Sequence, residues 1–291
     1  MTGRRNYLLN IPESAFLGLL QGLCEFLPVS SSGHLLLARL LLGVQTDTPA
    51  LKMLDILLHV GTLIPVVVIF WKDWISMIAH PVRNKTPLLL FIASLPTLAV
   101  YLGAKKLFPE LGGFDVFDSG WFLGVSFLLT AFFLIICDLR SRSDSCRKQK
   151  PGFFSAVVMG FFQGIGMIPG ISRSGSTITG GVLTGLQKTA AARFSFMMSA
   201  PAILGAMLME GKDAIELGYM KEISPVPAVI GILVACAAGF LAIRFMLRMI
   251  SRVPMSWFAL YLALIGVIYL FLQLTGSSLL PAFALPEIAA G

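Results

Sequence analysis

The sequence predicts an all-α integral membrane protein in which six transmembrane helices and two re-entrant helical hairpins form an inverted-topology repeat. Its composition is the first observation, because 56% of the 291 residues are hydrophobic and 13% are charged. The mean hydropathy of +0.85 is too high for a soluble domain, which must present a polar surface to water. The distribution of Lys and Arg and an internal duplication are the other two observations. We expect residues 1-291 to form one membrane domain that keeps its N-terminus, since no small-residue cleavage site follows the first apolar stretch.

The transmembrane helices are located by apolar runs and by the charged connections between them. An apolar helix of about twenty residues crosses roughly 30 Å of hydrocarbon, and connections rich in Lys and Arg stay on the cytoplasmic side. Thirteen basic residues mark one side, namely Lys72, Arg83, Lys85, Arg140, Arg142, Arg147, Lys148, Lys150, Lys188, Arg193, Arg244, Arg248 and Arg252. Eight mark the other side, among acidic residues, namely Arg4, Arg5, Arg39, Lys52, Lys105, Lys106, Lys212 and Lys221.

These two sets lie on opposite sides of the membrane if six ranges cross it. The predicted spans are 54-71, 87-103, 120-138, 194-210, 226-247 and 255-274. Each of the segments 14-42 and 153-186 then enters and leaves the membrane by the same face. The apolar helices in these segments are short, which suits a half-crossing better than a full span. Both termini lie outside in this topology, and the larger basic set lies in the cytoplasm.

The two hairpins are related in sequence. At a constant offset of 142 residues, Gly18, Gln21, Gly22, Ser30, Ser32 and Gly33 align with Gly160, Gln163, Gly164, Ser172, Ser174 and Gly175 without a gap. Repeat one covers about 1-138 and repeat two about 152-274, and a cytoplasmic loop, 139-151, joins them. The charges indicate that the first hairpin enters the membrane from the outer face and the second from the cytoplasmic face. The repeats therefore have inverted topology, and the hairpin tips are expected to meet near the bilayer midplane.

Hairpin loops at this depth must enclose a polar chamber. Lipid offers no partner to backbone N–H and C=O groups, so irregular backbone is tolerated only when it is buried in protein or lines a wet cavity. The half-helices of the hairpins also direct their N-termini into this chamber. Free N–H groups and the helix dipole at those termini favour an anion.

The first hairpin carries a candidate nucleophile and base. Gln21 and Glu25 share one helix face, and the turn between Pro28 and Gly33 lets Ser30, Ser31, Ser32 and His34 face one small space. An ionisable residue inside a membrane segment is costly and marks a functional site. A hydroxyl beside a carboxylate and an imidazole is the arrangement that activates a weak nucleophile. The alternatives are a structural Glu25 bound to backbone donors and a serine loop that only forms a turn or a helix cap.

The second hairpin supplies a cation at the position equivalent to Ser31. Arg173 lies between Ser172 and Ser174, and Gly175 and Thr177 follow. A guanidinium forks onto phosphate oxygens, and adjacent hydroxyls and backbone N–H groups can complete an anion cradle. The alternative is a structural ion pair between Arg173 and Glu25, and the two roles can alternate as substrate binds and leaves.

Other polar residues carry weaker signals. Asp55 and His59 lie one turn apart in an apolar span, and we expect them to be satisfied inside the bundle rather than to form a proton path or metal site. The four cysteines are scattered, and no protein-only metal cage is visible in the sequence. The basic cluster from Arg140 to Lys150 is expected to be a solvated loop, so no nucleic-acid partner is predicted.

At these residues the sequence resembles the undecaprenyl-diphosphatase family, also called bacitracin-resistance proteins. The family signatures are an (E/Q)-x-x-x-E motif that runs into P-V-S-S-[ST]-G-H, and P-G-x-S-R-S-x-x-T. Residues 28-34 and 169-177 match them throughout, together with Gln21 and Glu25. Gln21 stands where many members have Glu, which weakens any mechanism that needs two carboxylates at a metal.

The resemblance implies hydrolysis of undecaprenyl diphosphate to the monophosphate carrier of peptidoglycan and other wall polymers, at the outer face of the bacterial plasma membrane. It also implies a divalent cation, Mg²⁺ or Ca²⁺, and bacitracin resistance through competition for the same lipid. By position, Ser31 would be the nucleophile, Glu25 the base or metal contact with Gln21 in support, His34 an acid/base or orienting group, and Arg173 the phosphate clamp. The phosphate-binding set would be Ser30, Ser32, Gly33, Ser172, Ser174, Gly175 and Thr177.

Three alternatives stay open at this point. Inverted repeats with broken helices are also a transporter design, so a polyprenyl-phosphate transporter or flippase is the main rival. A phosphohistidine at His34 would use the same residues as a phosphoserine at Ser31. The oligomeric state is undetermined, with a homodimer as one arrangement.

Overall fold

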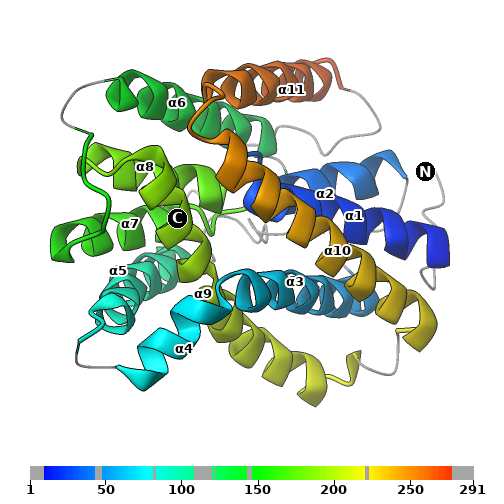
Figure 1. Cartoon of the computed structure of the whole chain (residues 1–291). Helices are drawn as coiled ribbons and strands as arrows, with labels where there is room; N and C mark the ends of the chain where they lie inside the picture. The colour runs from blue at the N-terminus through cyan, green and yellow to red at the C-terminus, as the bar shows by residue number, and fades with distance from the viewer. Residues whose placement is uncertain are drawn as a thin grey trace.

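The computed structural model describes residues 10–42, 48–80, 83–107, 120, 122–142, 146–219 and 223–276, without the side chains of residues 105, 210 and 213. These residues form eleven α-helices and, apart from one isolated bridge between Lys148 and Leu186, no β-structure (Figure 1). The helices are α1 (Ile11–Phe26), α2 (Ser31–Leu41), α3 (Pro49–Ile69), α4 (Trp71–Ala79), α5 (Thr86–Leu107), α6 (Leu123–Ser141), α7 (Phe153–Ile165), α8 (Arg173–Leu183), α9 (Lys188–Glu216), α10 (Pro225–Met249) and α11 (Ser256–Leu274). The basic residues Arg4, Arg5 and Lys221 of the topology count lie outside the described residues.

Six of these helices are long and apolar enough to cross a membrane: α3, α5, α6, α9, α10 and α11. They correspond one to one with the six predicted spans, so the prediction of a multi-pass, all-helical membrane protein is confirmed. The boundaries differ by a few residues. Helix α6 continues to Ser141 and so takes the first three residues of the predicted loop 139-151.

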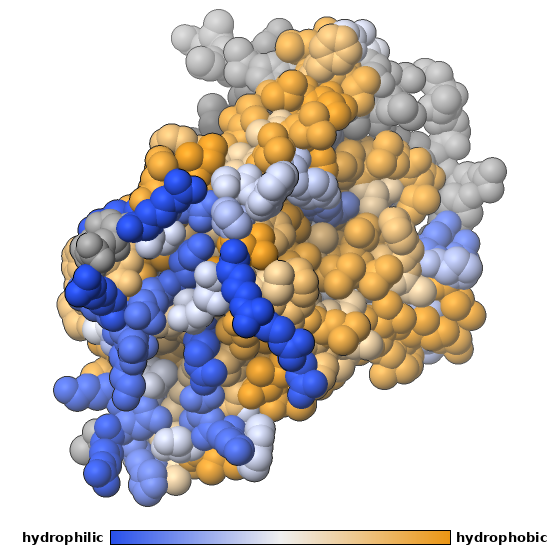
Figure 2. All heavy atoms as spheres, turned by 45° about the horizontal axis from the view of Figure 1, so that its top comes forward, coloured by the Kyte–Doolittle hydropathy of each residue, from blue (hydrophilic) through white to orange (hydrophobic). Residues whose placement is uncertain are grey.

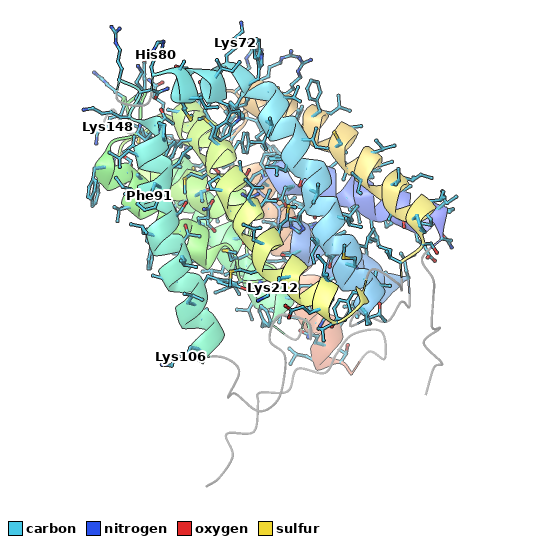
Figure 3. All side chains as sticks on the ribbon, turned by 90° about the horizontal axis from the view of Figure 1, so that it is seen from below. Lys72, His80, Phe91, Lys106, Lys148 and Lys212 are labelled. Atoms are coloured by element: carbon cyan, nitrogen blue, oxygen red, sulfur yellow. The ribbon has the colours of Figure 1, made fainter. Side chains whose placement is uncertain are left out.

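The charged ends of the bundle agree with the charge count. Hydrophilic side chains gather at one end of the molecule in Figure 2, and the flank beside them is hydrophobic. Lys72 and Lys148 lie at one end, and Lys106 and Lys212 lie toward the other (Figure 3). The flanks of the bundle therefore suit lipid and the two ends suit water, as the positive-inside rule requires.

Helix α4 was not predicted. Its nine residues follow α3 directly, and Trp71, Ile75 and Ile78 are exposed while Met77 is buried. Asp73 in its first turn pairs with Arg193 of α9 at 3.0 Å. A short amphipathic helix at the end of a span suits the membrane interface, and a periodic pattern of this length is too short to recognise in a sequence.

The two predicted hairpins are each built from two short helices, α1 with α2 and α7 with α8. Their lengths are 16, 11, 13 and 11 residues, in chain order. Side-chain caps fix the helix starts: Asn10 and Glu13 form a capping box on α1, and Ser30 and Ser172 accept from the third N–H of α2 and α8.

Each predicted hairpin packs against a span from the other half of the chain. Helix α1 lies along α10, and α7 lies along α5 (Figure 1). Gly18 and Gly22 let α1 approach so closely that a Cβ at Gly18 would lie 2.4 Å from the Gly231 carbonyl oxygen. Their aligned counterparts do the same in α7, where a Cβ at Gly160 would lie 2.1 Å from the Ala93 carbonyl oxygen. Spacings of four residues between small side chains are typical of close helix contacts in membranes.

Candidate active site

The carboxylate of Glu25 is the centre of the candidate active site. It lies in the last turn of α1 and is 6% exposed. Its Oε2 accepts hydrogen bonds from Ser31 Oγ at 2.6 Å and from Gln21 Nε2 at 3.0 Å. Its Oε1 forms an ion pair with the Arg173 guanidinium. Four residues that the sequence motifs single out therefore meet at one buried carboxylate.

Ser31 is the first residue of α2, and the residue before it has an unusual backbone. Ser30 has φ 70° and ψ 103°, and it is the only non-glycine residue with a positive φ in the described part of the chain. Such a conformation costs roughly 1–3 kcal/mol and is found mostly at functional sites. The strained turn places the Ser31 hydroxyl back against Glu25, six positions earlier in the chain.

Arg173 reaches Glu25 from the other hairpin. It is the first residue of α8, and its Cα packs on Gly166, where a Cβ would approach to 2.6 Å. The alternative of an Arg173–Glu25 ion pair is thus the arrangement in this structure. Because Ser31 binds the other oxygen of the same carboxylate, a hydroxyl and a guanidinium are brought together at Glu25.

The loops before α2 and α8 make matching contacts. The hydroxyls of Ser30 and Ser32 lie 3.4 Å apart, and those of Ser172 and Ser174 lie 3.3 Å apart. Across the interface, Ser32 Oγ accepts from the Gly170 N–H at 3.3 Å, and Ser174 Oγ donates to the Leu27 carbonyl oxygen at 2.9 Å. The two loops therefore meet, as predicted, and serine hydroxyls join them.

Several residues of the predicted phosphate-binding set hold the loops in place. Ser172 caps α8 through the Gly175 N–H at 3.1 Å, and Gly33 lies so close to Phe127 that a Cβ would come within 2.6 Å. Thr177 donates to the Arg173 carbonyl oxygen at 2.8 Å and also bonds to Ser195 of α9. Ser172 and Thr177 thus contact the first turn of α8, the turn that carries Arg173.

His34 is directed away from Glu25, in contrast to the expectation that it shares the space of Ser31. Its Nδ1 lies 2.7 Å from the Ser30 carbonyl oxygen, and its Nε2 lies 2.8 Å from the Tyr261 hydroxyl. The ring is also stacked on Tyr261, with centroids 5.7 Å apart. A carbonyl can only accept, so Nδ1 carries the proton in neutral His34, and the Tyr261 hydroxyl donates to Nε2. Both ring nitrogens are therefore engaged by groups other than the carboxylate.

A second imidazole lies nearer to the carboxylate. His59 Nε2 is 3.9 Å from Glu25 Oε2, while His59 Nδ1 lies 2.8 Å from the Asp55 carbonyl oxygen in its own helix. The side chain of His59 is 35% exposed, so it reaches from Glu25 toward open space. Asp55 is satisfied by an ion pair with Arg39, as expected. The spacing of Asp55 and His59 was visible in the sequence, but the direction of His59 around an apolar helix was not.

The side-chain oxygens at this site can bind a cation only if ligands from another molecule complete its coordination. The described residues contain no group of three His, Cys, Asp or Glu side chains that could hold a metal. Beside Glu25, however, the buried Oε1 of Gln21 lacks a hydrogen-bond partner within the described residues. Carboxylate and amide oxygens are the ligands that Mg²⁺ and Ca²⁺ prefer, so Gln21 and Glu25 can contribute part of a coordination shell that phosphate oxygens would complete.

Comparison with known proteins places this site in a family. Residues 14–268 match the family model described as bacitracin resistance protein BacA. A protein of Carboxydothermus hydrogenoformans is 37% identical over 269 residues, which are 92% of this chain and 99% of the relative. A protein of Halothermothrix orenii is 38% identical over 265 residues, which are 91% of this chain and 98% of the relative. A third protein, of Bacillus thuringiensis subsp. konkukian, is 36% identical over 270 residues, which are 92% of this chain and 99% of the relative. The first two are named undecaprenyl-diphosphatase and the third undecaprenyl-diphosphatase 4. The chain belongs to the BacA family of bacitracin resistance proteins.

Proposed function

We propose that this protein hydrolyses undecaprenyl diphosphate to undecaprenyl phosphate and inorganic phosphate. The observation that carries the proposal is the shared carboxylate, because Glu25 binds the Ser31 hydroxyl at 2.6 Å on one oxygen and the Arg173 guanidinium on the other. A nucleophile with its base and an anion clamp are the groups that phosphoryl transfer requires. The relatives named undecaprenyl-diphosphatase supply the substrate class.

Substrate binding begins with an exchange of partners at Arg173. The terminal phosphate of the diphosphate takes the place of the carboxylate on the guanidinium, which can bind two phosphate oxygens at once. This exchange frees Glu25 Oε1 and leaves Oε2 on Ser31. The Arg173–Glu25 ion pair is therefore the resting arrangement, and the carboxylate becomes available as a base when substrate binds.

The first chemical step transfers the terminal phosphoryl group to Ser31. Glu25 accepts the hydroxyl proton as Ser31 Oγ bonds to phosphorus, and the bond from phosphorus to the bridging oxygen breaks. Undecaprenyl phosphate leaves with the electron pair of that bond. Glu25 gives up this first proton to the departing phosphate or to water. A water molecule then attacks the phosphoserine, and Glu25 accepts a proton from it and returns that proton to Ser31 Oγ as the bond from Oγ to phosphorus breaks, so that inorganic phosphate is released and the Ser31 hydroxyl is restored. Arg173 and the N–H groups at the starts of α2 and α8 offset the negative charge in transit.

A divalent cation completes the proposed site. Bound together with the substrate, Mg²⁺ or Ca²⁺ would neutralise charge on the phosphate oxygens. Gln21 Oε1 and Glu25 would hold it from the protein side, which accounts for the buried amide oxygen that has no partner among the described residues. His59, next to Glu25, would orient the carboxylate or the attacking water.

The proposed membrane arrangement is two re-entrant hairpins in an inverted repeat, with the site open to the outer face of the bacterial inner membrane. Its support is the pairing of equivalent contacts in the two halves: serine with serine in the loops, and Gly18 and Gly160 against α10 and α5. In this position the enzyme recycles the lipid carrier of peptidoglycan. It confers resistance to bacitracin because it competes with the antibiotic for the same lipid.

Phosphate release from a polyprenyl diphosphate by the purified protein in detergent tests the proposal. Wild type, Ser31→Ala and Arg173→Ala are compared with and without EDTA. Ser141→Ala and Arg193→Ala are the matched controls, because Ser141 bonds only near the end of α6 and Arg193 is half exposed. The proposal is supported if the wild type and both controls release phosphate and both site variants do not. A wild type that binds undecaprenyl phosphate without releasing phosphate contradicts it and favours a transporter.

A further inference from the structure

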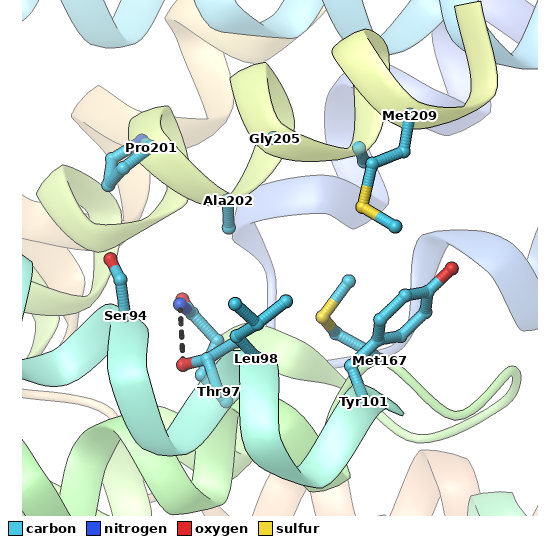
Figure 4. A pocket seen from close by; sticks show the side chains of 11 residues that line it. Ser94, Thr97, Leu98, Tyr101, Met167, Pro201, Ala202, Gly205 and Met209 are labelled. Carbon is cyan, nitrogen blue, oxygen red and sulfur yellow. Dashed lines mark hydrogen bonds between the residues drawn. The ribbon is translucent and has the colours of Figure 1, made fainter. Parts of the chain in front are cut away.

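A pocket opens between α5, α9 and the end of α7, away from the contacts of Glu25. Its cavity volume is about 190 Å³, below the roughly 300–1,000 Å³ of sites for whole small molecules, so the pocket can take one segment of a longer ligand. Its lining includes Thr97, Leu98, Gln163, Met167, Gly205 and Met209. Figure 4 shows Met167 and Met209 on opposite walls, with Leu98 and Tyr101 on the α5 side.

The walls of this pocket are suited to a hydrocarbon chain. The hydroxyls of Ser94 and Thr97 donate to carbonyl oxygens of their own helix, each at 2.9 Å, so these side chains do not require a polar ligand. The Gln163 amide donates from Nε2 to Thr97 at 3.3 Å. Its Oε1 has no hydrogen-bond partner among the described residues, but that atom is itself buried and is not exposed to the pocket. The remaining lining is mostly methionine, leucine, alanine, glycine and proline. Methionine adapts its shape to irregular apolar ligands.

The mouth of the pocket faces the side of the bundle that lipid covers. Leu98 is 47% exposed and Met209 is 42% exposed at its rim, and Leu204 beside it is 46% exposed. Both α5 and α9 are candidate spans. A chain that lies in the bilayer can therefore enter between them without crossing a polar surface.

The inner end of the pocket lies against the loop that carries Arg173. Met167 follows Gly166, and Gly166 packs on the Arg173 Cα, where a Cβ would come within 2.6 Å. Met167 also aligns with Glu25 in the repeat, as Gln163 aligns with Gln21. One half of the molecule thus has a carboxylate at this position, and the other half has an apolar side chain facing a cavity.

We propose that this pocket binds the isoprenoid chain of the lipid substrate, next to its diphosphate. The inference rests on the proposed function, because it takes the phosphate site at Arg173 as the place of the headgroup. The occupant is a polyprenyl chain rather than a bilayer acyl chain because the pocket ends at the phosphate loop, so one ligand can fill both sites. Met167 and Met209 would contact the isoprene units nearest the headgroup.

The experiment uses photolabelling by a farnesyl diphosphate analogue that carries a diazirine at the end of its chain. Full-length protein in detergent is labelled, and the modified peptides are identified by mass spectrometry. Gly205→Phe fills the pocket, and it has space to do so, since a Cβ at Gly205 meets no atom within 4 Å. Gly103→Phe is the matched control, because Gly103 on α5 is equally open and does not line the pocket.

Label on peptides that contain Met167 or Met209, reduced about tenfold by Gly205→Phe and unchanged by Gly103→Phe, supports the inference. In the phosphate assay Gly205→Phe should raise KM about tenfold and leave kcat unchanged, the pattern of lost ground-state binding. Label elsewhere, or label that Gly205→Phe does not reduce, overturns it. So does competition by phosphatidylglycerol as strong as that by undecaprenyl phosphate, because the pocket would then be a general lipid site. Pocket labelling in a protein that releases no phosphate would leave the chain site standing and reject the phosphatase instead.

Discussion

The hydroxyl of Ser31 donates a 2.6 Å hydrogen bond to Glu25 Oε2, across a turn in which Ser30 has positive φ. The donor and acceptor are six residues apart, too far for neighbours on a continuous helix. The end of α1 and the start of α2 are therefore arranged around this one bond. Removal of the Ser31 hydroxyl, of the Glu25 carboxylate or of a group that binds either should therefore change the activity.

Glu25→Gln should abolish most phosphate release while the protein still binds lipid monophosphate. The change keeps the shape of the side chain but removes the base, which typically contributes about 10²–10⁴-fold. It also leaves Arg173 without its ion pair, which costs about 3 kcal/mol for a buried pair. Phosphate assays and thermal melting in detergent measure the two effects. Glu216→Gln, in an exposed pair with Lys212, is the control that should change neither.

Arg173→Lys should reduce kcat/KM by about 10²-fold although the charge is kept. An ammonium group cannot bind two phosphate oxygens in the plane that a guanidinium offers, and loss of one donor to a transition-state anion has an effect of about this size. Steady-state kinetics with a polyprenyl diphosphate give the value. Activity close to wild type would mean that Arg173 contributes only charge, while Arg193→Lys should be silent in either case.

His59→Gln should lower kcat more than it raises KM. Its Nε2 lies 3.9 Å from Glu25 Oε2, so its removal would affect the base and leave the lipid-binding surfaces intact. Tyr261→Phe provides the comparison, because it releases His34 without altering the Glu25 contacts. If Tyr261→Phe lowers kcat and His59→Gln does not, His34 is the imidazole that takes part in the reaction.

The covalent intermediate should be a phosphoserine. Rapid acid quench of the enzyme with a ³²P-labelled diphosphate should give label that survives acid and maps to the peptide containing Ser31. Label that acid removes and alkali preserves would indicate phosphohistidine and overturn the assignment. The Ser31→Ala protein should take up no label, and a trapped adduct on His34 in that variant would be decisive against Ser31.

Gly160→Ala should destabilise the protein although it lies away from the carboxylate. The new Cβ would lie 2.1 Å from the Ala93 carbonyl oxygen, so α7 would have to move away from α5. Overpacking of this kind costs about 1–3 kcal/mol, seen as a lower Tm in detergent. Gly103→Ala is the control, since Gly103 also lies inside a helix, α5, and a Cβ there meets no atom within 4 Å. Equal Tm values for the two variants would contradict the close packing.

The sequence was sufficient for the six spans and for most of the residues at Glu25. Length and hydropathy decide whether a helix crosses a membrane, and the aligned motifs brought Ser31 and Arg173 into equivalent positions. Side-chain direction was harder to predict. Asp55 and His59 share one face of α3, but nothing in the sequence shows which neighbouring helix this face meets, so the approach of His59 to Glu25 could not be predicted. His34 bonds to Tyr261, 227 positions later in the chain, and no local pattern predicts such a pairing.

The packing of α1 on α10 has a consequence for how the protein is made. Helix α1 leaves the ribosome well before α10, yet the carbonyl groups against which Gly18 and Gly22 pack belong to α10. Until α10 has been inserted, this face of α1 has no native partner. A chain that stops before Pro225 would keep Glu25, Ser31 and Arg173 in its sequence and still lack the support that α10 gives to their arrangement. The active site is therefore completed late in biosynthesis, when α10 enters the membrane.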